Sequence, residues 1–147
     1  MALTCVALTG GEGRRMDPAT PEKADLMLGD RTFLQWALSS VPVTARLVLQ
    51  GRPCALPVGV WKATVSPDPE WCNGPAQALH VALRGASQDD EILAIHGDQW
   101  VDFDMAHFLR VARNSGLPAA VPVVHRYPKP WSACEVDGSG TVTRVRS

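Results

Sequence analysis

The chain has 147 residues, of which 46% are hydrophobic and 20% are charged, a composition typical of a soluble globular protein with one domain over residues 1–147. Its formal net charge is −1, so no general electrostatic attraction to nucleic acid or to an anionic membrane is expected, and any polyanion must bind at a local site. No apolar stretch reaches about 18 residues, and the N-terminus lacks the basic start and long apolar region of a signal peptide, so we expect a cytoplasmic protein.

The four cysteines give no sign of a metal site or of a disulfide framework. They are widely spread and show no Cys-x-x-Cys spacing: Cys5, Cys54, Cys72 and Cys134. We therefore interpret them as buried or free thiols in a reducing compartment.

A glycine-rich motif follows the first apolar run of the chain. Residues 2–8 predict a short buried strand. The residues after it combine glycine with arginine: Gly10, Gly11, Gly13, Arg14 and Arg15. Glycine allows tight turns and close approach of a ligand to main-chain N–H groups, and the guanidinium fork of arginine suits phosphate oxygens. The motif therefore predicts a phosphate-binding loop.

This loop matches neither of two better-known phosphate-binding patterns. The P-loop ends in Gly-Lys-Ser/Thr, which is absent here. The dinucleotide fingerprint opens directly into a helix, whereas Pro18 and Pro21 stand where that helix would run.

The next part of the chain predicts one helix and two strands. Residues 17–29 are irregular, and Asp30 is expected to cap a helix from about Arg31 to Ser40. A brief apolar strand is predicted at residues 47–49, and a weaker strand at residues 60–65.

A clear helix and a strand come next. Gly74-Pro75 starts the helix, since a proline at the first helical position lacks only an N–H that would be unpaired anyway. Residues 92–95 form an apolar run that is typical of a strand buried on both faces. Gly97-Asp98 follows this run directly.

Three further elements are predicted toward the end of the chain. Asp102 or Asp104 is expected to cap a helix. The apolar face of this helix is formed by Phe108, Leu109, Val111 and Ala112. A strand is predicted at residues 119–124 and a β-hairpin over residues 134–145.

Short apolar strands alternate with amphipathic helices along the chain. This alternation predicts an α/β fold, a Rossmann-like three-layer α/β/α arrangement with a mostly parallel sheet and a C-terminal β-hairpin. Ligands of such sheets bind beyond the carboxyl ends of the strands. The glycine-rich loop follows one strand and Asp98 follows another, so we expect both at the same edge of the sheet.

A phosphate-binding loop and a carboxylate at one edge suggest a nucleoside triphosphate with Mg²⁺. Asp98 is the best candidate ligand, because Mg²⁺ is usually held by one or two carboxylates plus phosphate oxygens and waters. Arg15 and Lys23 supply the positive charge that a polyphosphate needs. Two alternatives stay open: Asp98 by itself could cap a turn, and Lys23 by itself could be an exposed surface lysine.

The opening of the chain resembles a known family. Residues 8–20, Leu-Thr-Gly-Gly-Glu-Gly-Arg-Arg-Met-Asp-Pro-Ala-Thr, with Lys23 after them, are similar to the first motif of the sugar-phosphate nucleotidyltransferases. The molybdenum cofactor guanylyltransferase-like proteins share this NTP transferase superfamily, but the proline and the threonine favour the sugar-phosphate branch. Residues 74–79 resemble the family's second nucleotide-contacting segment. Gly97-Asp98 resembles its strand-end metal site, and residues 131–136 resemble its strand near the acceptor sugar.

The resemblance implies a reaction in which a sugar 1-phosphate attacks the α-phosphorus of a nucleoside triphosphate and pyrophosphate is released. Arg15 would stabilise the charge that develops during attack, Lys23 would hold phosphates, and Asp98 would hold Mg²⁺. The nucleotide would be contacted by Leu8, Thr9, Gly10, Gly11, Gly13, Gly74 and Gln77. Ser132 and Glu135 would lie on the acceptor side.

Some features depart from the family pattern. The resemblance covers the nucleotide-binding half, and the acceptor half is incomplete within residues 1–147. Ser132 stands where a glycine is expected, and Ala24 stands where the family usually has proline. An active nucleotidyltransferase is one hypothesis. The others are an inactive nucleotide-binding module or regulatory subunit, and a half-site completed by a second copy or another chain. The base and the sugar stay open.

Overall fold

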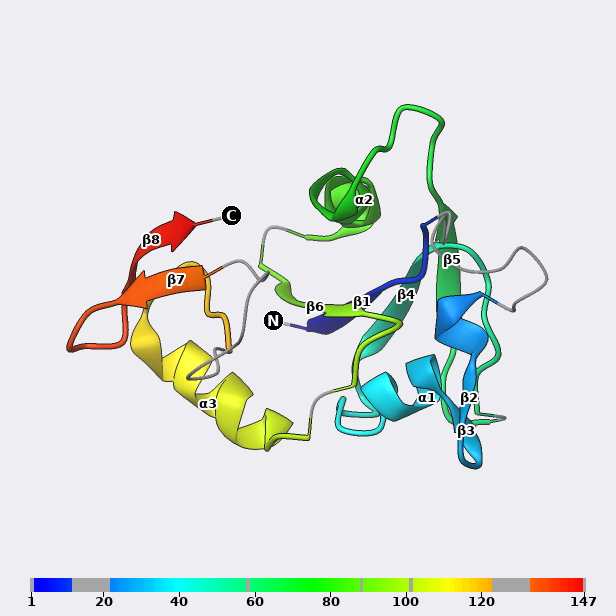
Figure 1. The fold of residues 1–147 in the computed structure, drawn as a ribbon, viewed down its shortest axis with the longest axis horizontal. Coiled ribbons are helices and arrows are strands. Elements are labelled where there is room, and N and C mark those ends of the chain that lie inside the picture. Colours follow the sequence, from blue (N-terminus) through cyan, green and yellow to red (C-terminus); the bar gives the residue numbers. More distant parts are fainter. Residues whose placement is uncertain are drawn as a thin grey trace. The chain divides into compact units, whose positions relative to one another are not determined.

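The structure, a computed structural model, describes residues 2–11, 22–57, 59–87, 89–100, 102–122 and 133–146 (Figure 1). These residues form two compact units, Met1–Leu109 and Arg110–Ser147. The expectation of one domain over residues 1–147 stays a prediction.

A four-stranded parallel sheet forms the centre of the first unit. Its strands lie in the order β5 (Ala63–Pro67), β4 (Arg46–Gly51), β1 (Leu3–Leu8) and β6 (Glu91–His96). β1 pairs with β4 on one side and with β6 on the other. The predicted parallel α/β sheet is therefore confirmed, and the carboxyl ends of its strands share one edge.

Two strands differ from their predictions. β5 begins at Ala63, because Val60 lies in the turn that precedes it. β6 is an edge strand in the described part of the chain. Its Leu93 is buried but Ile92 is 37% exposed, so the prediction of burial on both faces is wrong. An apolar run does not by itself distinguish a central strand from an edge strand.

Helices cover both faces of the sheet (Figure 1). On one face, α2 (Pro75–Ala82) contacts β1 and β4, and it starts with Pro75 at its first position, as predicted. On the other face, the side chains of α1 (Phe33–Leu38) join the core that contains Cys5 and Ala7 of β1. A short 3₁₀ turn, η2 (Leu83–Gly85), follows α2. The three-layer arrangement predicted from the sequence is present in this unit.

The cap of α1 differs from the prediction. Residues before it form η1 (Lys23–Asp25) and a small antiparallel pair, β2 (Met27–Leu28) with β3 (Arg31–Thr32). Asp30 lies in the turn of this pair, so the prediction that it caps a helix from about Arg31 is wrong. Thr32 caps α1 instead. Its Oγ1 accepts from the amide of Gln35 at 3.2 Å, and Gln35 Oε1 accepts from the amide of Thr32 at 3.1 Å.

Helix α3 (Met105–Ser115) begins in the first unit and ends in the second. Asp104, one of its two predicted caps, accepts a hydrogen bond from the amide of His107 at 2.8 Å. Phe108 and Leu109 pack against the core of the first unit, as predicted. Val111 is 51% exposed and does not belong to the apolar face.

The second unit contains the predicted hairpin. β7 (Ala133–Val136) and β8 (Val142–Arg146) pair in antiparallel fashion, which confirms the hairpin over residues 134–145. Residues 119–122 form no strand, so that part of the strand predicted over 119–124 is wrong. Residues 123 and 124 lie outside the described residues.

The hairpin turn depends on the charged form of Asp137. Its Oδ1 accepts from the amides of Ser139 and Thr141, both at 2.9 Å, and from Ser139 Oγ at 2.6 Å. These bonds, that of Ser139 first, lower the pKa of Asp137 below its ordinary value of 3.8. Because the folded pKa is depressed, the stabilising bonds are fully present above pH 3.8 and are lost as the pH falls through the lower, folded value. NMR chemical shifts of the Ser139 and Thr141 amides should follow this titration, and a midpoint above 3.8 would contradict it.

All four cysteines are free, and burial raises the pKa of Cys5 to about 12. None of the helices in the described ranges combines the length and the apolar character needed to cross a lipid bilayer.

Candidate active site

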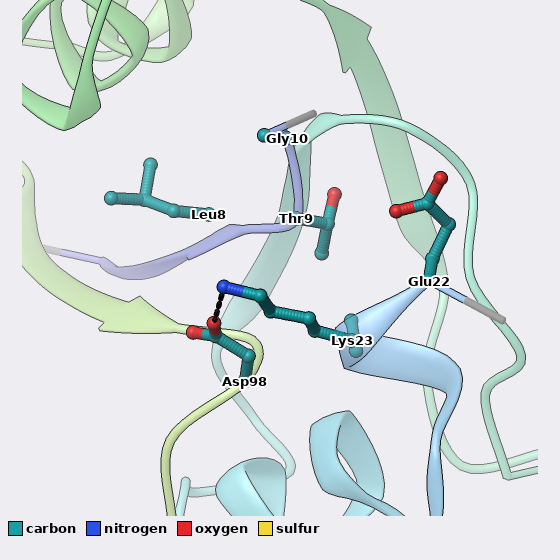
Figure 2. A pocket seen from close by; sticks show the side chains of 8 residues that line it. Leu8, Thr9, Gly10, Glu22, Lys23 and Asp98 are labelled. Carbon is teal, nitrogen blue, oxygen red and sulfur yellow. Dashed lines mark ion pairs between the residues drawn. The ribbon is translucent and has the colours of Figure 1, made fainter. Parts of the chain in front are cut away.

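A small pocket lies at the carboxyl ends of β1 and β6 (Figure 2). It is lined by Leu8, Thr9, Gly10, Gly11, Glu22, Lys23, Ala24 and Asp98. Its volume is about 50 Å³, well below the roughly 300–1,000 Å³ of a pocket that encloses a whole small molecule. A space of this size suits a phosphate group or an ion, and a base or sugar would extend beyond it.

The glycine turn after β1 is tied to the end of β4. The amides of Thr9 and Gly10 donate to the carbonyl of Gln50 at 2.8 and 3.1 Å. The hydroxyl of Thr9, which is buried, donates to the carbonyl of Arg52 at 2.8 Å. The turn is therefore a fixed continuation of the sheet.

Close backbone approach explains two of the glycines. Gly51 has φ of +116°, and a Cβ there would overlap the backbone N and Cα of Gly10. A Cβ at Gly10 would collide with Oδ2 of Asp68. Glycine at position 51 lets the end of β4 lie directly against the glycine turn, and glycine at position 10 leaves room for the side chain of Asp68.

Lys23 and Asp98 meet across this pocket. Lys23 begins η1, and Asp98 lies in the turn after β6. The amide of Gly97, next to Asp98, donates to the carbonyl of Leu8 at 3.0 Å and fixes that turn against β1. Lys23 extends toward Asp98, and its Nζ lies 3.6 Å from Oδ2 of the carboxylate (Figure 2). The strand order thus brings the glycine turn and Asp98 to one edge, where they were expected.

The side chains that line the pocket fit a metal ion whose other ligands are phosphate oxygens. In the described ranges no group of three or more His, Cys, Asp or Glu side chains is placed to hold a metal. Glu22 lines the pocket, but its carboxylate is paired with Arg52. Asp98 is paired as well, but its partner ammonium on Lys23 is 3.6 Å away and both side chains are partly exposed. Mg²⁺ commonly takes one or two carboxylates with phosphate oxygens and waters as its other ligands. Asp98 therefore fits as the protein ligand of a Mg²⁺–phosphate group.

The sequence matches a model of a known protein family over most of its length. The family is described as the MobA-like NTP transferase domain, and residues 5–135 are matched. The chain belongs to this family. The match begins within β1 and includes both Lys23 and Asp98. The resemblance to the nucleotidyltransferase superfamily is thereby confirmed.

A curated relative of low sequence identity also supports membership of this superfamily. Glucose-1-phosphate adenylyltransferase of Anaeromyxobacter sp. (strain Fw109-5) is 26% identical over 166 residues, which cover 94% of this chain and 40% of that protein. The NTP transferase domain therefore spans less than half the length of this relative.

The remaining site residues expected from sequence fall into three groups. Gly74 and Gln77 lie at the start of α2 and do not line the pocket, and Gln77 Oε1 accepts from the amide of Asn73 at 2.6 Å. Glu135 lies on β7 of the second unit. The residues that fall outside the described ranges are Gly13, Arg15 and Ser132. Their roles in this NTP transferase domain stay predictions.

Three residues next to the glycine turn were not expected from the sequence. Arg52 contacts the turn directly. Gln50 is fully buried, and its Nε2 donates to Oδ1 of Asp68 at 2.6 Å, while its Oε1 has no hydrogen-bond partner within the described residues. Gln50 and Arg52 lie at the carboxyl end of β4, and Asp68 lies at that of β5. The rule that ligand sites lie at these ends was the signal that could have identified them.

Proposed function

We propose that this NTP transferase domain transfers a nucleotidyl group from a nucleoside triphosphate to a sugar 1-phosphate or a similar phosphate acceptor, with Mg²⁺ as cofactor and with release of pyrophosphate. The observation that carries the proposal is the convergence of the glycine turn, Lys23 and Asp98 in one pocket. Family membership supports nucleotidyl transfer. The name of the relative, a glucose-1-phosphate adenylyltransferase, supports a sugar phosphate as acceptor.

The proposed chemistry requires positioning and charge stabilisation rather than a covalent intermediate. An oxygen of the acceptor phosphate forms a bond to the α-phosphorus, the bond from that phosphorus to the bridging oxygen breaks, and pyrophosphate leaves. The glycine turn lets phosphate oxygens approach the main chain at Gly11, because the amide of Gly10 already donates to the carbonyl of Gln50. Arg15 stabilises the charge that develops. Asp98 would hold Mg²⁺, which would neutralise part of the phosphate charge when bound.

Lys23 changes partner in this proposal. In the structure its ammonium group is paired with Asp98, and the two side chains are 45% and 34% exposed. An ion pair this exposed stabilises the fold by about 1 kcal/mol or less, so it breaks readily. A triphosphate that enters the pocket would take the ammonium as a phosphate ligand and leave the carboxylate of Asp98 to a metal ion.

Pyrophosphate release tests the proposal. The domain is incubated with each nucleoside triphosphate and a panel of sugar 1-phosphates, in the presence of Mg²⁺ and again with a chelator. We expect turnover with at least one pair, and its loss with the chelator. A well-folded protein that gives no turnover with any pair would overturn the proposed reaction.

A nucleotide-binding module without turnover is the second candidate. The pocket contains the residues expected on the phosphate side, and these alone would suffice to bind a nucleotide without transferring it. This candidate predicts Mg²⁺-dependent binding of a nucleoside triphosphate in calorimetry without pyrophosphate release. If activity instead appears only in a homo-oligomer or after addition of another chain, the pocket is one half of a shared site.

A further inference from the structure

The side chain of Arg52 contacts both Gly11 and Glu22, the residues on either side of segment 12–21. Nη2 of Arg52 donates to the carbonyl of Gly11 at 2.9 Å, and Nη1 of the same guanidinium is paired with the carboxylate of Glu22. Gly11 lies in the glycine turn after β1, and Glu22 directly precedes η1. Arg52 thus connects the two ends of a segment that belongs to a different part of the chain.

The backbone of Arg52 is itself fixed to the sheet. Its amide donates to Thr9 Oγ1 at 3.2 Å, and its carbonyl accepts from the same hydroxyl at 2.8 Å. Thr9 is only 6% exposed, so this reciprocal contact is shielded from solvent. The guanidinium therefore extends from a backbone that is fixed at the end of β4.

The geometry of the contact matters more than its charge. The side chains of Arg52 and Glu22 are 33% and 43% exposed, and ion pairs this exposed contribute little to stability by themselves. A guanidinium, however, is planar and presents five donors in a fixed fork, so it can serve two acceptors at once. A lysine ammonium at the same place is a single point charge on a flexible stem.

We propose that Arg52 is a positioning residue that clamps the two ends of segment 12–21 together. The first end carries the glycine turn, and the second end carries Lys23, the neighbour of Glu22. By holding both ends, Arg52 sets the distance across the pocket between the main chain that receives phosphate and the ammonium that binds it. The effect on nucleotide rests on the proposed function, but the clamp itself does not.

Hydrogen exchange followed by NMR tests the clamp without any ligand. The amides of Thr9 and Gly10 report on the first end, and those of Asp25 and Leu26 report on the second, because all four are hydrogen-bonded in the structure. We expect Arg52→Ala to accelerate exchange at both ends. Arg46→Ala is the matched control, since Arg46 is exposed at the opposite end of β4 and should leave these amides unchanged.

Two further variants test the contacts of Arg52 with Gly11 and with Glu22 separately. They also decide the question if Arg52→Ala does not fold. Glu22→Gln removes the charge pair but keeps the bond from Arg52 to Gly11, so exchange should accelerate mainly at Asp25 and Leu26. In Arg52→Lys, the amides of one end at least should still exchange faster than in the unaltered domain. Unchanged exchange in Arg52→Ala, acceleration at one end only, or full protection by lysine would each overturn the clamp. If Arg52→Ala does not fold, the Glu22→Gln and Arg52→Lys results decide.

Nucleotide affinity provides the second readout. We expect Arg52→Ala to raise the dissociation constant for the Mg²⁺–nucleoside triphosphate about tenfold, because one charge-assisted contact network is lost. The kcat at saturating substrate should stay within about twofold, because Arg52 contacts no reacting atom. If the unaltered domain binds no nucleotide, the proposed function fails while hydrogen exchange still decides the clamp. An unchanged dissociation constant despite faster exchange would overturn the positioning role.

Discussion

Replacement of Asp98 by asparagine is expected to lower the rate of the proposed transfer by on the order of 10³, because the amide keeps the shape of the side chain but removes the charge that would hold the metal ion. The free energy of unfolding should change by less than about 1 kcal/mol. The carboxylate is 34% exposed and its partner ammonium lies 3.6 Å away, so their pairing contributes little to stability. Pyrophosphate release measures the rate, and urea denaturation measures the stability.

Asp102→Asn is the matched control for this variant. Asp102 is an exposed carboxylate four positions further along and does not line the pocket, so its replacement should change neither quantity. If Asp98→Asn keeps the full rate, Asp98 is not part of the reaction. If the rate and the stability fall in parallel, Asp98 has a structural role instead.

Replacement of Gly51 by alanine is expected to have the largest effect on stability, a loss of about 3 kcal/mol or more. Two costs add: the positive φ of +116° at this position, and a Cβ that overlaps the backbone N and Cα of Gly10. Backbone atoms cannot move aside as a flexible side chain can, so the glycine turn must shift. Urea denaturation should show the loss, and nucleotide affinity should fall with it.

Gly29→Ala separates these two costs. Gly29 also has positive φ, +70°, but a Cβ there would have no atom within 4 Å. It should cost only the strain of the left-handed conformation, about 1–2 kcal/mol. Equal losses in the two variants would show that the approach of β4 to the glycine turn does not constrain position 51.

The sequence contained enough to place the main elements of the pocket. The apolar run at residues 2–8 and the one at 92–95 are both strands of one parallel sheet, with Leu8 opposite His96 in the register. Once two strands are parallel, the residues after them lie at the same edge. This argument alone brought the glycine turn and Asp98 together, although it gave no information on the side-chain contact between Lys23 and Asp98.

Contacts that depend on strand register could not be predicted from the sequence. Arg52 reaches Gly11 because β1 and β4 pair with Leu8 opposite Gln50, and an apolar pattern specifies strands without specifying this alignment. The predicted cap of α1 was wrong for a local reason. Asp30 and Thr32 are both good capping residues, and the glutamine three positions after Thr32 decides between them. Ser132, which lies outside the described residues, depends on the family resemblance alone. Arg15, also outside them, depends on that resemblance and on the positive charge that a polyphosphate needs.

The central place of the first strand has a consequence for biosynthesis. β1 leaves the ribosome before every strand it pairs with, and its second neighbour, β6, ends only at His96. At about 5–20 residues per second, on the order of ten seconds pass between synthesis of the glycine turn and synthesis of Asp98. During that interval the apolar strand has an open hydrogen-bonding edge, which invites pairing with another nascent chain. We therefore expect the pocket to be among the last parts of its unit to form, and nascent chains stalled before residue 96 to depend on chaperones to stay unaggregated.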